Sequence, residues 1–543
     1  MVLFPNRLLY PENYDYKGEQ PLKDFGFIKS LQIDEMVVLV RQSYRGFNDL
    51  KLQDYFLTDP DVLEYRIQIV SDLVENPALY EVFVSSIPML QNLVEMRRAM
   101  DNTFSVESSL TSVRYLEIYQ EVVDLFAEGL KQTNLNSEGL QQFRDAVMAI
   151  YEGEEYRNLR TELAKVEVRF GNLKSLTIGI NLDSNLSVRE AGIVSVNDQP
   201  FHAGTLMERL LKKDPLDTNS LISPFYPLSK GLHGEELKAL NFTIQNSLNT
   251  IYAKAVKSFG PVVQRYFNVN TSVFTALLDD IRFLTAGVKF IFSMREKGFS
   301  MCRPHIAPVA DKKCELQGVY NPILADKLIE KTIVSNSFSY DENGRFYLVT
   351  GPNHGGKSIF AYSIGMAQAL FQLGLFVPAE HALMSPVTGI FTHFPSSDEG
   401  NYGKGRLESG CARLGAIMKQ LSDTDLLLMD ESFSSTSGLE AGYIATEVLT
   451  GIGSIGCGGI FVTHIHDLPQ KLEIYNSHPL NRGKIDNLVA LMENREDGTR
   501  SYKIARTTPD GLSYAKDIAG QYGLDLESIL SVQGRTEDGH GLE

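Results

Sequence analysis

The sequence predicts a multidomain protein, in which a long α-helical region with a small β-containing tip precedes an α/β domain built around a phosphate-binding loop. Two observations predict the α/β domain. An apolar strand at 345–350 runs into a Gly-rich loop and a helix, and a second apolar strand at 426–429 ends in two carboxylates. A third observation predicts the helical region, because apolar residues recur at helical spacing from 60 to 174 and again from 244 to 288.

The Gly-rich loop follows the G-x-x-x-x-G-K-[ST] pattern of phosphate-binding loops. Its glycines let backbone N–H groups approach a phosphate closely, and the following helix adds the free donors and dipole of its N-terminus. Lys357 supplies a cation for the β/γ-phosphates, and the Ser358 hydroxyl suits a Mg²⁺ ligand. A Gly-rich turn without a ligand is the alternative, and the flanking strand and helix argue against it. The predicted nucleotide-binding residues are Gly351, Pro352, Asn353, His354, Gly355, Gly356, Lys357 and Ser358.

The second strand brings acidic side chains to the same edge of the predicted sheet. Asp430 is the candidate Mg²⁺ residue, and Glu431 is the candidate catalytic residue that orients or deprotonates the attacking water. An acidic turn after a core strand is common in isolation, but its pairing with the loop favours a nucleotide site. A third strand, at 459–462, leads to His464, whose position at a strand end makes it a second catalytic candidate.

Composition limits the function classes. The chain has 543 residues, 43% hydrophobic and 22% charged, which predicts a soluble protein with room for two to four domains. No secretory signal and no run of about 18 apolar residues is apparent, so we expect no membrane span and a cytoplasmic location. The four cysteines lack metal-like C-x-x-C spacing and suit a reducing compartment. A net charge of −17 restricts any contact with nucleic acid to a local basic strip.

The tip is predicted at about 175–230, between outgoing and returning helices. At 176–182 the apolar period changes from about 3.6 to 2, and a second strand-like segment follows at 186–196, which predicts a hairpin. The tip also carries four basic residues, but Glu190, Glu208 and Asp214 balance them, which favours a solvated charged face. Those four residues are Arg189, Arg209, Lys212 and Lys213.

At this point the α/β region resembles a known family, the MutS family of DNA mismatch-repair ATPases. The resemblance is close over about 310–530 and looser back to about residue 50. The segments that carry it are 351–358 (Gly-Pro-Asn-His-Gly-Gly-Lys-Ser), 428–431 (Leu-Met-Asp-Glu), 435–437 (Ser-Thr-Ser), 463–468 (Thr-His-Ile-His-Asp-Leu), 375–379 and 389–392.

The resemblance implies a domain order and a reaction. Residues 1–50 have no assignment, 51–310 would form the helical core and lever domain with its clamp-like tip, and 311–535 would form an ABC-type P-loop ATPase domain. A polar tail at 536–543 is predicted to be disordered. The resemblance further implies hydrolysis of ATP to ADP and phosphate with Mg²⁺, a homodimer, and DNA as partner, whether duplex, branched or mismatched. In the family the tip touches DNA, so the resemblance makes Arg189, Arg209, Lys212 and Lys213 the candidate DNA contacts.

Three positions depart from the family pattern. The aromatic residue that stacks on adenine in the family corresponds here to Ile333 or Val334, which weakens base stacking and leaves the choice between adenine and guanine open. In the family, one loop reaches across to the γ-phosphate bound by a partner subunit. In the corresponding loop of this chain, Lys404, Arg406 and Ser409 are alternative candidates for that contact. The contact loop after the acidic pair has diverged as well, and its candidate cross-subunit residues are Ser435, Thr436 and Ser437.

Two function classes remain. The first is an ATPase-gated dimeric clamp on DNA that acts in repair or recombination. Mismatch reading is doubtful, because about 50 residues before the core helices cannot hold the family's mismatch-recognition domain, and the chain resembles a short form without it. The second class is the same ATPase switch acting on a ribosome or another protein complex. A membrane-transport motor fits worse, because the long helical region has no membrane-coupling element.

Overall fold

The structure, a computed structural model, divides into two compact units. The first unit comprises Met1–Leu8, Ala78–Asn134 and Leu140–Ile281, and the second comprises Leu9–Pro77, Leu135–Gly139 and Arg282–Glu543. The residues that the structure describes are 7–12, 14, 22–35, 51–99, 106–170, 175–185, 188–197, 199, 242, 244, 271–328, 333–395, 406–433, 436–465, 467–494, 499–507, 523–524 and 528–529.

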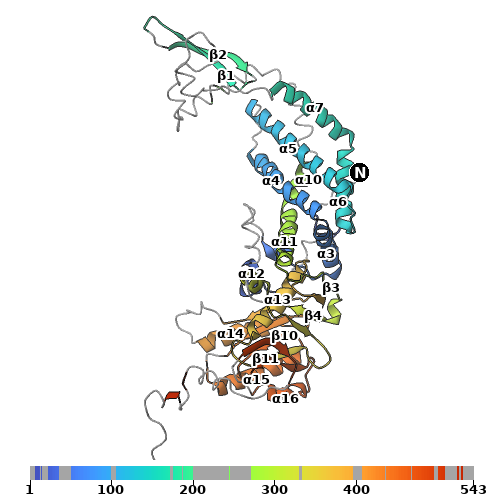
Figure 1. The fold of residues 1–543 in the computed structure, drawn as a ribbon, viewed down its shortest axis with the longest axis vertical. Coiled ribbons are helices and arrows are strands. Elements are labelled where there is room, and N and C mark those ends of the chain that lie inside the picture. Colours follow the sequence, from blue (N-terminus) through green and yellow to red (C-terminus); the bar gives the residue numbers. More distant parts are fainter. Residues whose placement is uncertain are drawn as a thin grey trace, which may run out of the picture. The chain divides into compact units, whose positions relative to one another are not determined.

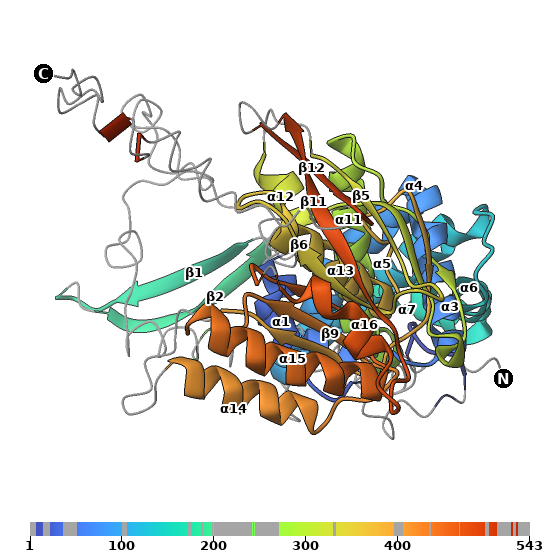
Figure 2. The same ribbon diagram turned by 90° about the horizontal axis from the view of Figure 1, so that it is seen from below.

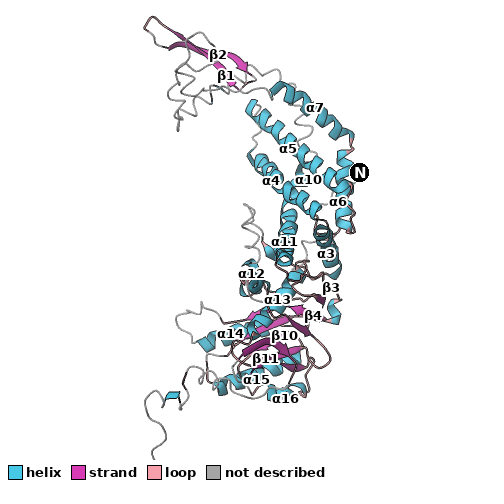
Figure 3. Cartoon of the chain, in the orientation of Figure 1, coloured by secondary structure: helices cyan, strands magenta, loops and turns pink. Residues whose placement is uncertain are grey.

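The first unit is largely helical, which confirms the predicted helical N-terminal region (Figure 1, Figure 3). Aromatic side chains form its core: the rings of Phe83, Phe126 and Phe143 pack with centroids 5.1 to 6.0 Å apart, and all three are fully buried. Its helices are α4 (Pro77–Ala99), α5 (Val106–Lys131), α6 (Glu138–Tyr151), α7 (Glu154–Phe170) and α10 (Thr271–Ala276).

A two-stranded antiparallel hairpin follows α7, where the sequence predicts one. Strand β1 (Ser175–Leu182) pairs with β2 (Val188–Asn197), and Ile180 lies opposite Ala191. The period-2 pattern places apolar residues along one face of β1, where Ile178 and Leu182 are 44% and 52% exposed. Residues 200–230 of the predicted tip lie almost wholly outside the described part of the chain.

The second unit contains a six-stranded mixed sheet in the order β12-β11-β6-β10-β9-β8. The five strands from β11 to β8 are parallel, and β12 pairs antiparallel with β11 at the edge. Strand β10 pairs with β6 on one side and β9 on the other, so the carboxyl ends of these three buried strands meet at one edge. The strands are β6 (Phe346–Thr350), β8 (Ile390–His393), β9 (Leu426–Asp430), β10 (Gly458–Val462), β11 (Ile485–Asn494) and β12 (Thr499–Ala505).

A smaller four-stranded sheet, in the order β3-β7-β4-β5, belongs to the same unit. Its strands are β3 (His305–Ile306), β4 (Cys314–Val319), β5 (Asn336–Ser339) and β7 (His381–Met384). Helices cover the larger sheet, and α14 and α15 lie side by side along it (Figure 2). These helices and turns are α12 (Pro322–Lys327), α13 (Lys357–Gln372), α14 (Arg406–Met418), α15 (Gly438–Ile455), α16 (Leu472–Asn476), η4 (Val309–Asp311) and η5 (Pro469–Lys471).

The second unit also takes in an early segment of the chain, and Arg66 lies at its centre. The Arg66 side chain is fully buried and donates hydrogen bonds to the carbonyls of Tyr55 and Leu373. Leu57 and Gln372, at the carboxyl end of α13, exchange a backbone hydrogen bond of 2.8 Å and a side-chain bond of 3.0 Å. The early elements are α1 (Gly26–Ser30), η2 (Leu52–Tyr55) and α3 (Pro60–Glu75), and α11 (Leu278–Glu296) runs mainly in this unit.

Helix α3 begins at a proline and is capped by Asp59, whose carboxylate accepts from the N–H groups of Asp61 and Val62, as its sequence suggests. Asp72 near its end accepts from the N–H groups of Asn136 and Ser137. None of the helices within the described ranges combines the length and the apolar character that crossing a membrane requires.

Candidate nucleotide site

The predicted phosphate-binding loop connects β6 to α13 and turns sharply over its glycines. Gly351 and Gly356 have φ values of 122° and 86°, in a region that side-chain-bearing residues rarely adopt. A Cβ added at Gly351 would also lie 2.8 Å from the Ala490 carbonyl oxygen, and one at Gly355 would lie 3.0 Å from the Pro352 oxygen. Glycine at these positions therefore lets the backbone fold more closely than any other residue would, which is the geometry of a phosphate cradle.

Lys357, the first residue of α13, is buried within this loop. Its ammonium donates to the carbonyl oxygens of Gly351 at 3.0 Å and Pro352 at 2.8 Å. Burial lowers the pKa of Lys357 to about 8, and the nearby charges of Glu431 and Asp430 oppose that change. A phosphate in the loop would add negative charge beside the ammonium and favour its protonated form.

Asp430, the last residue of β9, faces the start of α13. The Ser358 hydroxyl lies 3.1 Å from its carboxylate, and the Tyr362 hydroxyl is a second hydrogen-bond partner. Burial raises the pKa of Asp430 to about 6, although the bond from Ser358 opposes the change. A buried carboxylate beside a serine hydroxyl is a donor set that suits Mg²⁺, because a divalent cation would offset the cost of burying the charge.

We expect the buried charge of Asp430 to lower the folding stability of the protein when no metal is bound. Between pH 4 and pH 6 the unfolded chain loses the Asp430 proton before the folded chain does, so folding stability falls as pH rises and stays low at pH 8. One pKa unit corresponds to about 1.4 kcal/mol, so the cost is about 2 to 3 kcal/mol. We therefore expect Asp430→Asn to raise the thermal unfolding midpoint at pH 8 without Mg²⁺, measured by calorimetry.

The gain should shrink as pH falls from 6 toward 4 and vanish below the ordinary Asp pKa of 3.8, where the carboxyl is mostly neutral in both states of the wild type. The variant should also lose the extra stability that Mg²⁺ with ATP gives the wild type. An unchanged or lower midpoint at pH 8 would show that burial of the Asp430 charge is not costly.

Glu431 follows Asp430 at the end of the same strand and makes a close pair with His464. Its backbone has a φ of 46°, and its N–H donates to the Val462 carbonyl at 2.9 Å, which ties the turn to the end of β10. The His464 Nε2 atom lies 2.9 Å from Glu431 Oε1, and the two side chains are 37% and 40% exposed. The left-handed turn thus points the carboxylate out of the sheet toward the loop, where a water molecule can reach it.

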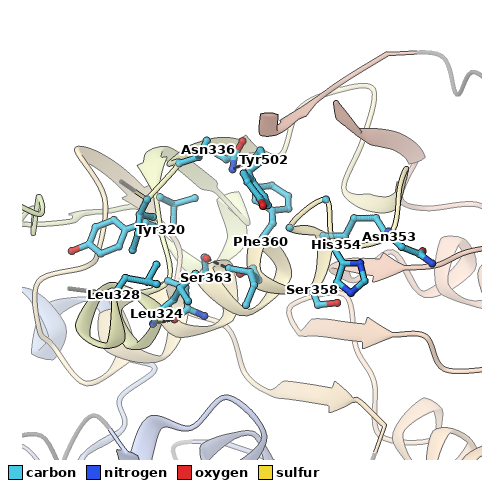
Figure 4. A pocket seen from close by; sticks show the side chains of 18 of the residues that line it. Tyr320, Leu324, Leu328, Asn336, Asn353, His354, Ser358, Phe360, Ser363 and Tyr502 are labelled. Carbon is cyan, nitrogen blue, oxygen red and sulfur yellow. Dashed lines mark hydrogen bonds between the residues drawn. The ribbon is translucent and has the colours of Figure 1, made fainter. Parts of the chain in front are cut away.

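Lys357, Ser358, Glu431 and His464 line one cavity of ≈ 710 Å³. Asn353, His354 and Ser358 of the loop lie at one end of it, and Tyr320, Leu324 and Leu328 lie at the other, where the surface is mostly apolar (Figure 4). The apolar and aromatic side chains that line the cavity include those of Tyr320, Leu324, Leu328, Ile333, Val334, Phe360 and Tyr502. Ile333, predicted from the sequence, is among them, whereas Tyr502 carries no motif by which the sequence would single it out.

The other predicted site residues lie elsewhere or outside the described part of the chain. Ser409 lies on α14, Ser437 caps the N-terminus of α15, and the Thr436 hydroxyl bonds to Glu440. Arg189 is exposed on β2. Arg406 begins α14, but its side chain is not described. Lys404, Ser435, Arg209, Lys212 and Lys213 lie outside the described residues.

Two family models match the chain: the MutS2 N-terminal domain over residues 58–297 and MutS domain V over residues 347–518. The chain belongs to the MutS family. The DNA mismatch repair protein MutS of Petrotoga mobilis is 24% identical over 93% of this chain and 64% of its own length. The yeast (Saccharomyces cerevisiae) DNA mismatch repair protein MSH2 is 22% identical over 82% of this chain and 50% of its own length.

A third relative, the MutS protein of Prochlorococcus marinus strain MIT 9301, is 31% identical over 41% of this chain. That match covers 24% of the relative. The chain thus spans less than two thirds of the length of each of these three relatives.

Proposed function

We propose that this chain is an ATPase that hydrolyses ATP to ADP and phosphate with Mg²⁺, and that this cycle gates the grip of a homodimer on DNA. The observation that carries the ATPase proposal is the meeting of Lys357, Asp430 and Glu431 beside the phosphate-binding loop. Asp430 and Glu431 lie at the carboxyl end of β9, and Lys357 begins α13. This is the placement that phosphoryl transfer requires of a cation, a metal ligand and a water-orienting base.

Each residue has one task in this proposal. The loop's N–H groups and Lys357 hold the β- and γ-phosphates, while Ser358 and Asp430 hold Mg²⁺. Glu431 accepts a proton from, or orients, the attacking water, and His464 at 2.9 Å fixes the direction of that carboxylate. Bound ATP with Mg²⁺ supplies the scissile phosphoanhydride bond and the charge that draws these groups together.

The nucleobase would lie at the apolar end of the cavity. Among the described residues that line the cavity, the one carboxylate is Glu431, at the phosphate end. A guanine site commonly offers a carboxylate to the base's N–H groups, so the apolar walls support ATP over GTP.

A homodimer is supported by the surface beside the cross-subunit candidates. Leu439 and Tyr443, on the first turns of α15 just after Ser437, are 88% and 71% exposed. Large apolar side chains so exposed, next to a nucleotide site, suit a surface that a second copy covers.

DNA as the partner is supported by the relatives, which are named as DNA mismatch repair proteins. The described part of the hairpin adds little to this proposal, because Arg189 there is offset by Glu190 and Asp183. The homodimer would therefore bind DNA through a few local basic residues rather than through a broad basic face.

We expect the protein to bind DNA with an affinity that falls steeply with salt, because phosphate contacts release counterions. Mobility shifts with labelled duplex, mismatched, junction and single-stranded DNA, each titrated with salt from about 50 to 200 mM, measure this. The control is the same series without nucleotide, since gating requires that ATP changes the affinity. Absence of binding to every DNA at the lowest salt would contradict a DNA clamp and favour a protein or ribosome partner.

A further inference from the structure

The edge strand β12 carries an irregularity next to the nucleotide cavity. Regular pairs with β11 occur at Ala490–Ile504 and Met492–Arg500, so three residues of β12 face a single residue of β11 between them. The middle residue of the three, Tyr502, has a φ of 55°, a left-handed conformation in which a bulky residue is strained. Bulges of this kind re-aim a side chain, and many lie beside active sites.

The bulge turns Tyr502 toward the phosphate-binding loop. The Tyr502 side chain lines the cavity (Figure 4) and remains 48% exposed. A Cβ added at Gly356 would lie 3.5 Å from Tyr502 Cδ1, so the edge of the ring is in van der Waals range of the loop. A ring at this point, between the phosphate loop and the apolar end, can pack against a nucleoside whose phosphates lie in the loop.

Asn336 holds this bulge from the neighbouring sheet. Its amide nitrogen donates to the Tyr502 carbonyl at 3.1 Å, and its amide oxygen accepts from the Ile504 N–H at 2.8 Å. One carboxamide thus makes the two bonds that a paired backbone would otherwise make to the edge of β12. The Lys503 ammonium adds a bond of 2.7 Å to the Ser335 carbonyl, next to Asn336 in the chain.

The two hydrogen bonds of Asn336 stabilise the bulge and offset the strain at Tyr502, which suits a holding role. Without them the edge strand would relax toward ordinary extended geometry, and the ring would leave the loop, because successive side chains of a strand point to opposite faces.

We propose that Asn336 is a positioning residue for the nucleoside end of the site: its carboxamide fixes the β12 bulge, so that the Tyr502 ring stays against Gly356 and packs on a nucleobase. The proposal rests on the proposed ATPase function. It assigns the contact with the base to β12, in addition to the Ile333 and Val334 positions before the loop.

The test compares two ligands, ATP and inorganic tripolyphosphate, each with Mg²⁺. Both carry the triphosphate that the loop would hold, but only ATP carries a base. We expect Tyr502→Gly, which removes the ring and relieves the strain, to weaken ATP binding about tenfold, the scale of one base–aromatic contact. Asn336→Ala should weaken ATP binding about fivefold, and neither change should alter tripolyphosphate binding in calorimetric titrations.

The control variants separate positioning from general damage. Tyr502→Phe keeps the ring and should bind ATP like the wild type. In a Tyr502→Gly background, Asn336→Ala should cost nothing further, because the two residues act as one unit. In steady-state hydrolysis, Asn336→Ala should raise KM for ATP and leave kcat within twofold, since it touches no group near the γ-phosphate.

Two outcomes would overturn the inference. Equal weakening of ATP and tripolyphosphate would show that Asn336 merely supports the fold of the loop. Unchanged ATP binding in Tyr502→Gly would show that the ring does not meet the base. The Lys357→Ala variant tests the proposed ATPase function separately from the role of Asn336. If this variant binds ATP and tripolyphosphate like the wild type, the loop is not a phosphate site.

Discussion

Replacement of Glu431 by glutamine is expected to slow ATP hydrolysis at least about a hundredfold while leaving ATP binding intact. The amide has the shape of the carboxylate and can still bond to His464, but it cannot take a proton from water. Among the described residues, the hydrogen bonds of Glu431 go to His464 and Val462 and not to the loop, so its carboxylate does not hold the loop in shape. Phosphate release in steady state measures turnover, and titration with a fluorescent ATP analogue measures binding.

The matched control is Glu473→Gln, which removes an exposed carboxylate on α16 and should leave turnover within twofold of the wild type. Turnover close to normal in Glu431→Gln would show that another group activates the water. Loss of binding together with turnover would mean instead that the carboxylate supports the loop.

The same variant should also trap a dimer. If each nucleotide is closed off by a second chain, ATP favours the closed dimer and hydrolysis releases it. Glu431→Gln removes the release step, so with ATP and Mg²⁺ it should sediment as a dimer at concentrations where the nucleotide-free protein is more dissociated. The net charge of −17 opposes association, but physiological salt screens most of that repulsion.

A charge on the exposed α15 surface provides the control for this experiment. Leu439→Glu, added to Glu431→Gln, places a carboxylate in the first turn of α15, where a helix tolerates it, and should prevent the ATP-induced dimer. Ile474→Glu makes the same change at an exposed position of α16 and should leave the dimer intact. A monomer with and without ATP, with hydrolysis per chain independent of protein concentration, would exclude the shared site.

Strands with strong local signals were predicted well from the sequence. The apolar runs at 345–350, 426–429 and 459–462 correspond to β6, β9 and β10, because residues of a buried parallel strand are apolar on both faces. The hairpin of β1 and β2 was also predicted, since alternation of apolar residues reports directly on a strand with two different faces. The roles assigned to the loop, to Asp430 and to Glu431 stay predictions until the variants are measured.

Features that depend on partners distant in the chain could not be predicted. In the sequence, Arg66 is one polar position in an amphipathic helix. It can be buried because its guanidinium donates to the carbonyls of Tyr55 and Leu373, which a helical pattern does not reveal. Tyr502 is similarly hidden, because the register shift that re-aims it arises from the pairing of two strands. The four-stranded sheet of β3, β7, β4 and β5 could not be predicted either. Its strands are too short to carry a long periodic pattern of apolar residues.

The joining of residues 9–77 to 282–543 in one compact unit has a consequence for biosynthesis. The ribosome makes the first part of this unit, then about 200 residues of the other unit, and only then the rest. At about 5 to 20 residues per second, the nascent chain carries the early segment for about 15 to 60 seconds before α13 is complete. Throughout that interval Leu57 and Arg66 lack their partners at the end of α13, and α3 has not yet met β3. Chaperone binding to the nascent chain should therefore concentrate on this early segment and end once residue 373 has left the exit tunnel.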